Sequence, residues 1–511
     1  MYTQLHSTGV FGIDAYMVEV EADVTSAFPS FDIVGLPDTA VKESRDRVRS
    51  ALKNSGFSFP NGRITVNLAP ADVKKAGSMY DLPSLLSILM ASGQLKVTCE
   101  LSECAFIGEL SLDGALRGIN GMLSMTIEAG AHGIKRFFVP VSNSFEASVV
   151  EGIEIYPVEN VRQLVGHLSG VSQIKPAKKP DISSKGLNFI PSFSEVRGQA
   201  AAKKALEIAA SGGHNALLIG PPGSGKSMLA KRMPSILPSM SFEESIETTK
   251  IHSVAGILPE ETPLITERPF RAPHHTVSAA GLSGGGVVPR PGEISLAHNG
   301  VLFLDEFPEF SRQAMETLRA PIEDGRVTIS RASGRLTYPC EFSLIAAMNP
   351  CPCGYFGHPK KKCICSQNSV KNYLGKISGP MLDRLDIHVE VAAVEYSELT
   401  GKPTGEPSAV IKKRVEAARR IQQERYKGTG INCNARLTPS LIGKYCVLTE
   451  DADKMLKSAF ERMGMSARSY DRILKIARTV ADLEGTEKIG SVHIAQAIQF
   501  RSLDRKYWNE L

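Results

Sequence analysis

The clearest chemical pattern in the sequence is Gly220-x4-Gly225-Lys226-Ser227, within LLIGPPGSGKSMLAKR. An apolar run, NALLIG, precedes this turn and a helical pattern follows it, which is the context that a phosphate-binding loop requires. Glycines let backbone N–H groups approach phosphate oxygens, the lysine adds positive charge, and the hydroxyl can bind Mg²⁺. The flanking strand argues against a chance glycine-rich turn. The predicted loop comprises Gly220, Pro221, Pro222, Gly223, Ser224, Gly225, Lys226 and Ser227.

Two carboxylates follow a second apolar run, GVLFLDEF. A buried strand over these apolar residues delivers Asp305 and Glu306 to its C-terminal edge, beside the phosphate loop. Asp305 is then predicted to hold the Mg²⁺ ion and Glu306 to polarise an attacking water. Apolar strands often end in acidic residues, so this pattern predicts nucleotide hydrolysis only in combination with the loop.

A third apolar run, FSLIAAMNP, ends at Asn349. An uncharged polar side chain at this strand end can orient the attacking water and sense the γ-phosphate. The alternative is a turn-forming asparagine before Pro350. The sensor role is favoured because the position repeats the strand-end geometry of Asp305.

Arg384 lies between acidic residues in SGPMLDRLDIHVEV, just before another strand-like run. One interpretation is an ion pair with Asp383 or Asp386. The other is an arginine finger that reaches the γ-phosphate of a neighbouring subunit and stabilises transition-state charge. A finger supplied in this way requires an oligomer.

Four cysteines form two Cys-x-Cys pairs in NPCPCGYFGHPKKKCICSQ: Cys351 with Cys353, and Cys363 with Cys365. Nucleotide hydrolysis needs no thiol, so a catalytic role is not expected. Four thiolates with His358 between them can close a tetrahedral Zn²⁺ site. The Cys-x-Cys spacing is tighter than the usual Cys-x2-Cys, so a metal-free turn, or pairs that oxidise in air, stays open as the alternative.

Two basic segments are candidates for contact with DNA. The long insert RPFRAPHHTVSAAGLSGGGVVPRPGE carries Arg271 and Arg290, and EDGRVTISRASGRLTYPCEF reads as a β-hairpin with Arg331 and Arg335 near its tip. Basic and backbone groups on such loops can follow the phosphates of a strand. The alternative for the insert is a surface loop that packs on the next subunit. The adjacent pair His274-His275 has no third metal ligand at suitable spacing.

The elements that position these residues suggest an α/β protein of several domains. Strands are predicted at 31–36, 63–69 and 134–140, and helices at 82–93, 410–426 and 469–485. The segment 173–189 is rich in Lys, Pro and Ser and reads as a linker. The predicted domain boundaries are 1–170, a linker at 171–192, a nucleotide-binding core at 193–395 and a helical domain at 396–511.

The amino-acid composition narrows the class of protein. The chain has 511 residues, 42% hydrophobic and 22% charged, with a net charge of +5, as expected for a globular protein of about three domains. The mild basicity is compatible with nucleic acid without indicating it. No signal peptide and no apolar run of membrane-spanning length is evident, so a cytoplasmic location without a membrane partner is expected. Nine cysteines, an odd number, make a poor disulfide framework.

The order of these motifs resembles the AAA+ ATPases of the magnesium-chelatase group. RPFRAPHHT, PGEISLAHNGVLFLDE, AAMNPCPCGY and GPMLDRLDIH together are similar to its YifB/ComM branch. FDIVGLPDTAVKESRDRV and ITVNLAPADVKKAGSMYDLP near the N-terminus match that branch too. The resemblance covers nearly the whole chain.

This resemblance implies a Lon-protease-like N-terminal α/β domain (ribosomal S5 domain 2-like), an AAA+ P-loop core and a helical C-terminal lid. It implies ATP and Mg²⁺ as cofactors, a homo-hexamer, and an ATP-driven DNA helicase that promotes branch migration in recombination or natural transformation, with recombination proteins as further partners. Asn349 and Arg384 take the first-sensor and finger positions, and Arg468 falls at a second sensor that contacts phosphate within its own subunit. A local pair with Asp471 is the alternative for Arg468.

Two other functions are alternatives to a DNA helicase. A chelatase-like motor would use the same ATPase to remodel a protein partner or drive metal insertion. A non-enzymatic scaffold is disfavoured by the complete set of ATPase residues.

Proteolysis by the N-terminal domain is not expected. Aligned with the Lon serine and lysine segments, the chain has Met79 and Met125 at the catalytic positions, with Ser78 one place off. A thioether cannot take a proton from a serine. Lys74 and Lys75 nearby are predicted to be solvated.

Overall fold

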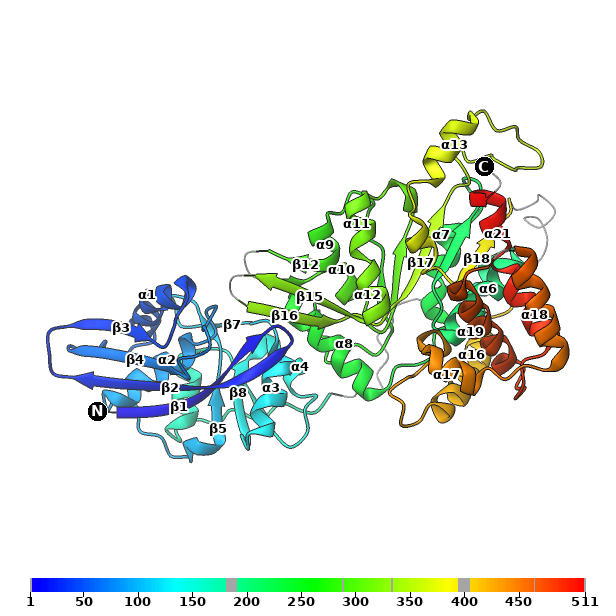
Figure 1. Ribbon diagram of the computed structural model, residues 1–511. Helices are drawn as coiled ribbons and strands as arrows, with labels where there is room; N and C mark the ends of the chain where they lie inside the picture. The colour runs from blue at the N-terminus through cyan, green and yellow to red at the C-terminus, as the bar shows by residue number, and fades with distance from the viewer. Residues whose placement is uncertain are drawn as a thin grey trace. The chain divides into compact units, whose positions relative to one another are not determined.

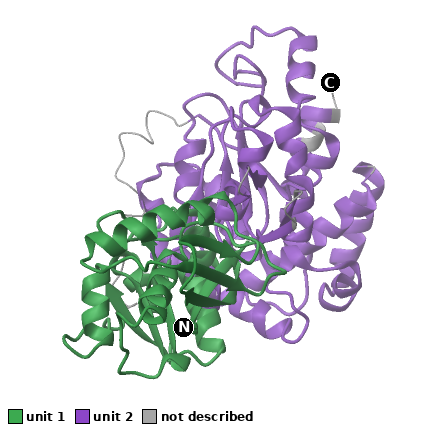
Figure 2. Ribbon diagram, turned by 90° about the vertical axis from the view of Figure 1, so that its left-hand side faces the viewer, with its two compact units in different colours: residues 1–186, 245–266 green, residues 187–244, 267–511 purple. Residues whose placement is uncertain are grey.

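The computed structural model describes residues 2–180, 191–286, 289–331, 334–393, 405–463 and 465–509. The chain divides into two compact units (Figure 2). Unit 1 comprises residues 1–186 and 245–266, and unit 2 comprises 187–244 and 267–511. The latter part of the predicted linker, and the predicted boundary at 395/396, fall outside the described residues.

In the described part of unit 1, one mixed sheet has the strand order β3-β4-β2-β1-β5-β8-β9. β2 pairs antiparallel with β1 over the whole length of β1, because only Gly12 and Ile13 separate the two strands. The strands predicted at 63–69 and 134–140 are confirmed as β4 and β8, and that at 31–36 as the slightly earlier β3. The strands are β1 (Tyr2–Phe11), β2 (Asp14–Thr25), β3 (Ser30–Val34), β4 (Arg63–Ala69), β5 (Cys104–Phe106), β8 (Arg136–Pro140) and β9 (Glu154–Val158).

The helices of unit 1 cover this sheet. The predicted helix at 82–93 is α2, whose residues are almost all buried; its Asp81 carboxylate accepts from Arg47 at 2.7 and 3.1 Å. A buried carboxylate needs such a partner. The helices and remaining short elements are α1 (Thr39–Asn54), α2 (Asp81–Ala91), η1 (Leu101–Glu103), β6 (Glu109–Leu110), β7 (Leu116–Arg117), α3 (Met122–Ala131), η2 (Val141–Asn143), α4 (Ser144–Ala147) and α5 (Val161–Leu168).

A segment from the middle of the predicted nucleotide-binding core packs in unit 1. Helix α8 (Phe242–Ala255) belongs to unit 1 from Ser245 onward, and the chain returns to unit 2 at Glu267. Leu264 joins Leu123 and Val149 in a small apolar cluster, and the Ser253 hydroxyl accepts from Gly121 N at 2.9 Å. The periodicity of the sequence did not predict that residues 245–266 pack in unit 1.

Unit 2 contains a parallel sheet with the order β11-β14-β17-β10-β18 among its described strands. Its strands β17 and β18 are labelled in Figure 1. The middle strands β14, β17 and β10 are buried along their whole length, which explains their uninterrupted apolar runs. Because all five strands are parallel, their carboxyl ends lie at one edge. The strands are β10 (Ala216–Ile219), β11 (Phe270–Arg271), β14 (Val301–Leu304), β17 (Ser343–Met348) and β18 (Ile387–Glu390).

Two antiparallel ribbons accompany this sheet. β12 (Gly284–Gly285) pairs with β13 (Arg290–Pro291), and β15 (Arg326–Arg331) pairs with β16 (Gly334–Pro339). The predicted hairpin is therefore confirmed, with Arg331 paired to Gly334.

Helices fill the rest of unit 2. The predicted helices at 410–426 and 469–485 are confirmed as α16 and α19, which both contact α6, and one apolar core joins these helices to the parallel sheet. No described helix has the combination of length and apolar character needed to cross a membrane. The helical elements are η3 (Phe193–Glu195), α6 (Ala200–Gly212), α7 (Lys226–Lys231), η4 (Met233–Ser235), α9 (Ala279–Ser283), α10 (Glu293–Leu296), η5 (Phe307–Glu309), α11 (Arg312–Thr317), α12 (Arg319–Asp324), α13 (Gln367–Leu374), α14 (Gly379–Leu382), α16 (Ser408–Arg425), η6 (Asn434–Arg436), α17 (Pro439–Tyr445), α18 (Glu450–Met463), α19 (Ala467–Leu483), α20 (Ser491–Gln499), α21 (Ser502–Asp504) and η7 (Arg505–Asn509).

Candidate nucleotide site

The glycine-rich loop connects β10 to α7 at the carboxyl edge of the parallel sheet. Gly223 and Gly225 have φ of 76° and 90°, the left-handed region that glycine adopts without strain. A Cβ at Gly220 would lie 2.2 Å from the carbonyl oxygen of Val391. These glycines are therefore required by the backbone path of the loop.

Lys226 is buried at the base of the loop. Its Nζ donates to Gly220 O at 2.7 Å, Pro221 O at 3.0 Å and Asn349 Oδ1 at 3.1 Å. Burial lowers the pKa of Lys226 to about 8, although the nearby carboxylates of Asp305 and Glu306 act in the opposite direction. The ammonium is thus held in place before any phosphate arrives.

The two predicted carboxylates lie where β14 ends. Ser227 Oγ donates to Asp305 Oδ2 at 2.5 Å, which brings together the hydroxyl and carboxylate expected to share a Mg²⁺ ion. Glu306 has a left-handed backbone, with φ of 52°, and its side chain is 58% exposed. Strain at a non-glycine residue is typical of functional positions.

These side chains line one cavity of about 500 Å³, which also includes Pro222 and Met348. That volume is in the usual range for small-ligand sites. The buried ammonium, the glycine backbone and the Ser227–Asp305 pair provide groups that suit a nucleotide triphosphate and its Mg²⁺ ion. The structure thus brings Lys226, Ser227, Asp305 and Asn349 together.

His275 is a site residue that sequence reasoning missed. Its Nδ1 lies 3.3 Å from Glu306 Oε2, and its ring packs edge-on to Phe310. His275 follows β11, which pairs parallel with β14, so both strands bring the following residues to the same edge. The motif RPFRAPHHT therefore carries this histidine to the strand edge, a role that its candidacy as a metal ligand does not indicate.

Arg384 binds its own chain. Its Nη2 lies 2.5 Å from Glu323 Oε1 of α12, and its Nη1 donates to Pro380 O at 2.6 Å. No ion pair of Arg384 with Asp383 or Asp386 is found among the described contacts, and Arg472 lies within 3.5 Å of both carboxylates. Burial opposes ionisation of Asp386, but His214 and Arg472 overcome it and lower its pKa to about 2.

Arg468 is exposed in the first turn of α19, and no ion pair with Asp471 is found among the described contacts.

The candidate DNA-binding arginines differ in availability. Arg271 forms two 2.7 Å hydrogen bonds with Glu293 and is therefore engaged within the chain. Arg290 on β13 and Arg335 on β16 are exposed. Arg331 closes the hairpin, and its side chain is outside the described part of the structure.

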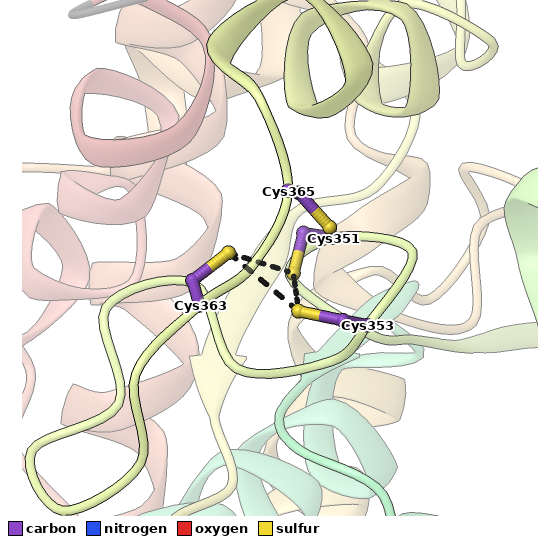
Figure 3. Close-up of side chains that lie close together, drawn as sticks. All are labelled: Cys351, Cys353, Cys363 and Cys365. Carbon is purple, nitrogen blue, oxygen red and sulfur yellow. Dashed lines mark hydrogen bonds between the residues drawn. The ribbon is translucent and has the colours of Figure 1, made fainter.

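The four cysteine sulfurs form a cluster after β17 (Figure 3). All four Sγ atoms lie within 4.8 Å of one another. His358 is not part of the cluster; its Nδ1 accepts from Lys360 N and Lys361 N at 3.0 and 2.9 Å.

The aligned protease positions are packed in apolar surroundings. Met125 is fully buried in the core, and Met79 packs against the same cluster. The Ser78 hydroxyl donates to the Glu109 carboxylate in a short hydrogen bond. The expectation that Lys75 is solvated is wrong: its side chain is fully buried, and burial lowers its pKa. Backbone hydrogen bonds of Lys75 to Leu36 and Asp38 fix the chain so that the side chain turns inward.

The parallel sheet, phosphate loop and strand-end carboxylates define the class of P-loop nucleotide-binding proteins. Comparison with family models is more specific. "Magnesium chelatase, subunit ChlI" matches residues 192–399, "Subunit ChlI of Mg-chelatase" matches 20–143, and "Magnesium chelatase, subunit ChlI C-terminal" matches 405–501.

Individual relatives extend over almost the full length. YifB of Salmonella typhimurium (strain LT2) is 41% identical over 502 residues, 98% of this chain and 97% of the relative. The competence protein ComM of Haemophilus influenzae is 41% identical over 509 residues, with the same two shares. The chain therefore belongs to the YifB/ComM family of magnesium-chelatase-like AAA+ ATPases.

Proposed function

We propose that this protein is an ATP-hydrolysing motor that acts on branched or single-stranded DNA as a homo-hexamer. The observation that carries the ATPase is the convergence of Lys226, Ser227, Asp305 and Asn349 on one cavity. The DNA substrate is supported by 41% identity with a protein named for competence, and by exposed arginines on the ribbons of unit 2.

ATP and Mg²⁺ are the proposed cofactors, and they would supply the phosphoryl group and the charge that neutralises its oxygens. The loop 220–227 holds the phosphates, with Lys226 as the fixed cation, and Ser227 and Asp305 hold the metal. Glu306 orients and polarises the attacking water, His275 positions the Glu306 carboxylate, and Asn349 connects Lys226 to the water side of the site.

Two arginines complete the proposed site. Arg384 leaves Glu323 and reaches the nucleotide of the next subunit as a finger, and Arg468 at the start of α19 contacts phosphate within its own subunit. With both roles filled, the nucleotide would be contacted by its own subunit and by the next subunit, as an ATP-driven motor requires.

We further propose that residues 1–170 form a Lon-protease-like domain without protease chemistry, that 171–192 are a linker, that 193–395 are the AAA+ core and that 396–511 are the lid. Met79 and Met125 support the first point, because neither can act as nucleophile or base. The motor would work in the cytoplasm, with recombination proteins as partners, in branch migration during recombination or natural transformation.

The hairpin β15–β16 and the ribbon carrying Arg290 are the proposed DNA contacts. The experiment compares wild type with Arg331→Ala/Arg335→Ala in binding to single-stranded DNA and in ATP turnover. If each arginine neutralises one phosphate, the slope of log affinity against log salt decreases by about 1.4, while turnover without DNA is unchanged. Arg462→Ala, on the exposed face of α18, is the matched control.

Two outcomes would separate the parts of this proposal. Lys226→Ala should reduce turnover at least about 100-fold, and full turnover would refute the ATPase. Normal ATPase activity without DNA binding or strand displacement would instead favour the second candidate, a magnesium-chelatase-like motor that remodels a protein partner or drives metal insertion, which the family matches support.

A further inference from the structure

Two short segments of the loop between β17 and α13 bring four sulfur atoms together (Figure 3). The Sγ atoms of Cys351 and Cys353 are 3.4 Å apart, and Cys363 Sγ lies 3.7 and 3.6 Å from them. Cys365 Sγ is within 4.8 Å of all three. Among the described residues, these four cysteines are the group of potential metal ligands (His, Cys, Asp or Glu) whose ligand atoms are close enough to share one ion.

The sulfur separations discriminate between the chemistries open to four cysteines. A disulfide places its sulfurs about 2.05 Å apart, much closer than these pairs. A tetrahedral zinc ion with Zn–S bonds of about 2.3 Å places them about 3.8 Å apart. The three shortest separations are close to that edge length. The cluster therefore has the dimensions of a site for one ion, and sulfurs in mutual contact leave no room for several metal atoms.

The surroundings of the cluster support a closed site. Cys351 is fully buried, and its Sγ accepts a hydrogen bond from Phe356 N at 3.3 Å. Such N–H groups stabilise the thiolate form that a metal requires. His358 does not belong to this group, so the four sulfurs form the ligand set among the described residues. Four thiolates with no open position are typical of structural zinc.

We propose that Cys351, Cys353, Cys363 and Cys365 bind one structural Zn²⁺ ion, and that this ion holds the phosphate loop in its nucleotide-binding conformation. The first half of the proposal stands on the sulfur geometry alone. The second half rests on the proposed ATPase function, and it follows from what the cysteine loop contacts.

One side of the cysteine loop packs on the phosphate loop. Gly354 has φ of 83°, and a Cβ there would lie 2.3 Å from Cδ of Pro222. Gly354 is adjacent to Cys353, and Cys351 is two residues after Asn349, whose side chain bonds Lys226. Displacement of this loop would therefore disturb the nucleotide cavity at two places, at Pro222 and at the hydrogen bond between Asn349 and Lys226.

The other side packs on the C-terminal segment η7. The Phe356 and Tyr507 rings lie 6.4 Å apart, and the side chain of Lys506 is the nearest group to Gly357. Lys506 in turn bonds Glu390 at the end of β18 at 2.8 Å. The zinc-bound loop would thus be held between the nucleotide cavity and the end of the chain.

The first test is elemental analysis of the full-length protein, purified without an affinity tag and under anaerobic conditions. We expect about one zinc ion per chain in wild type and in Cys99→Ser, a matched cysteine outside the cluster. Cys353→Ser and Cys363→Ser should each lose most of the zinc. No metal, iron instead of zinc, or full zinc in both variants would overturn the proposed site.

The second test follows ATP turnover while an organomercurial displaces zinc from the wild-type protein, so it does not depend on a variant that folds. Since misplacement of about 1 Å can cost about 100-fold, kcat/KM for ATP should fall by about tenfold or more and return on adding thiol and Zn²⁺. Cys99→Ser should respond in the same way. Unchanged turnover after zinc release would refute the coupling to the phosphate loop. Zinc binding without any ATPase activity would instead refute the proposed function alone.

Discussion

At the scale of single residues, the charge of Lys226 is finely balanced. Burial lowers its pKa to about 8, whereas Asp305 and Glu306 favour the charged form. The hydrogen bonds that Lys226 donates to Gly220 O, Pro221 O and Asn349 Oδ1 use all three protons of the ammonium form. The proposed phosphate contact needs the ammonium form, so nucleotide affinity depends on pH near the physiological range.

The sign of this dependence is definite. Below pH 8 Lys226 is charged, so phosphate binding does not require it to take up a proton. Above pH 8 the lysine must first be protonated, so each further pH unit should weaken ATP binding by up to about tenfold. The measurement is the affinity for a fluorescent ATP analogue between about pH 7 and about pH 9.5. Lys226→Arg is the control, because a guanidinium stays charged throughout. Equal slopes in both proteins would exclude Lys226 as the cause.

At the scale of elements, a buried charge network joins α16 to α19. Asp482 accepts from Arg425 at 2.9 and 2.6 Å, from Arg478 Nε at 3.0 Å and from Asn434 at 2.8 Å. The Arg478 side chain is only 1% exposed. Both helices contact α6, so this network fixes the helical part of unit 2 beside the parallel sheet.

Replacing Asp482 by Ala should destabilise unit 2 by about 3–5 kcal/mol, because Arg478 keeps its charge in a buried position without a counter-ion. Thermal unfolding should show a clearly lower midpoint. Glu424→Ala, an exposed change on α16, should cost less than about 0.5 kcal/mol. Equal midpoints for the two variants would show that the network contributes little to stability.

The elements also show what the sequence can and cannot predict. β10, β14 and β17 were predictable because buried parallel strands have continuous apolar runs, and their ends placed Lys226, Asp305 and Asn349 correctly. The packing of residues 245–266 in unit 1 was not predictable, because it brings together residues such as Leu264 and Leu123 that are more than a hundred positions apart in the sequence. Local patterns carry no record of such long-range packing, and the same reason hid the contact of Arg384 with Glu323.

At the scale of the whole molecule, the position of Arg384 bears on assembly. In a single chain Arg384 binds Glu323 on its own α12, and the Arg384 side chain is 9% exposed. If it serves the neighbouring subunit in a ring, it must exchange this partner for a phosphate when subunits meet. Catalysis would then belong to pairs of chains.

Mixing two inactive variants tests this. Lys226→Ala lacks the phosphate-loop cation but retains Arg384, and Arg384→Ala has the opposite defect. With random mixing in equal amounts, about a quarter of the interfaces would combine an intact loop with an intact finger, so about a quarter of wild-type ATP turnover should return. Turnover as low as that of each variant alone would mean that Arg384 acts within its own chain.

The excursion of residues 245–266 has a mechanical consequence. The polypeptide passes between the units three times: near 186, at 244 and at 266. The last two passages are clamped together, since Arg268 bonds Glu244 at 2.8 Å and Pro238 O at 2.6 Å beside them. If the linker were cut, the segment 245–266, whose two ends are held together, would still connect the two units. The residues that flank the segment 245–266 are thus held together within unit 2, just before the strand β11 that precedes His275.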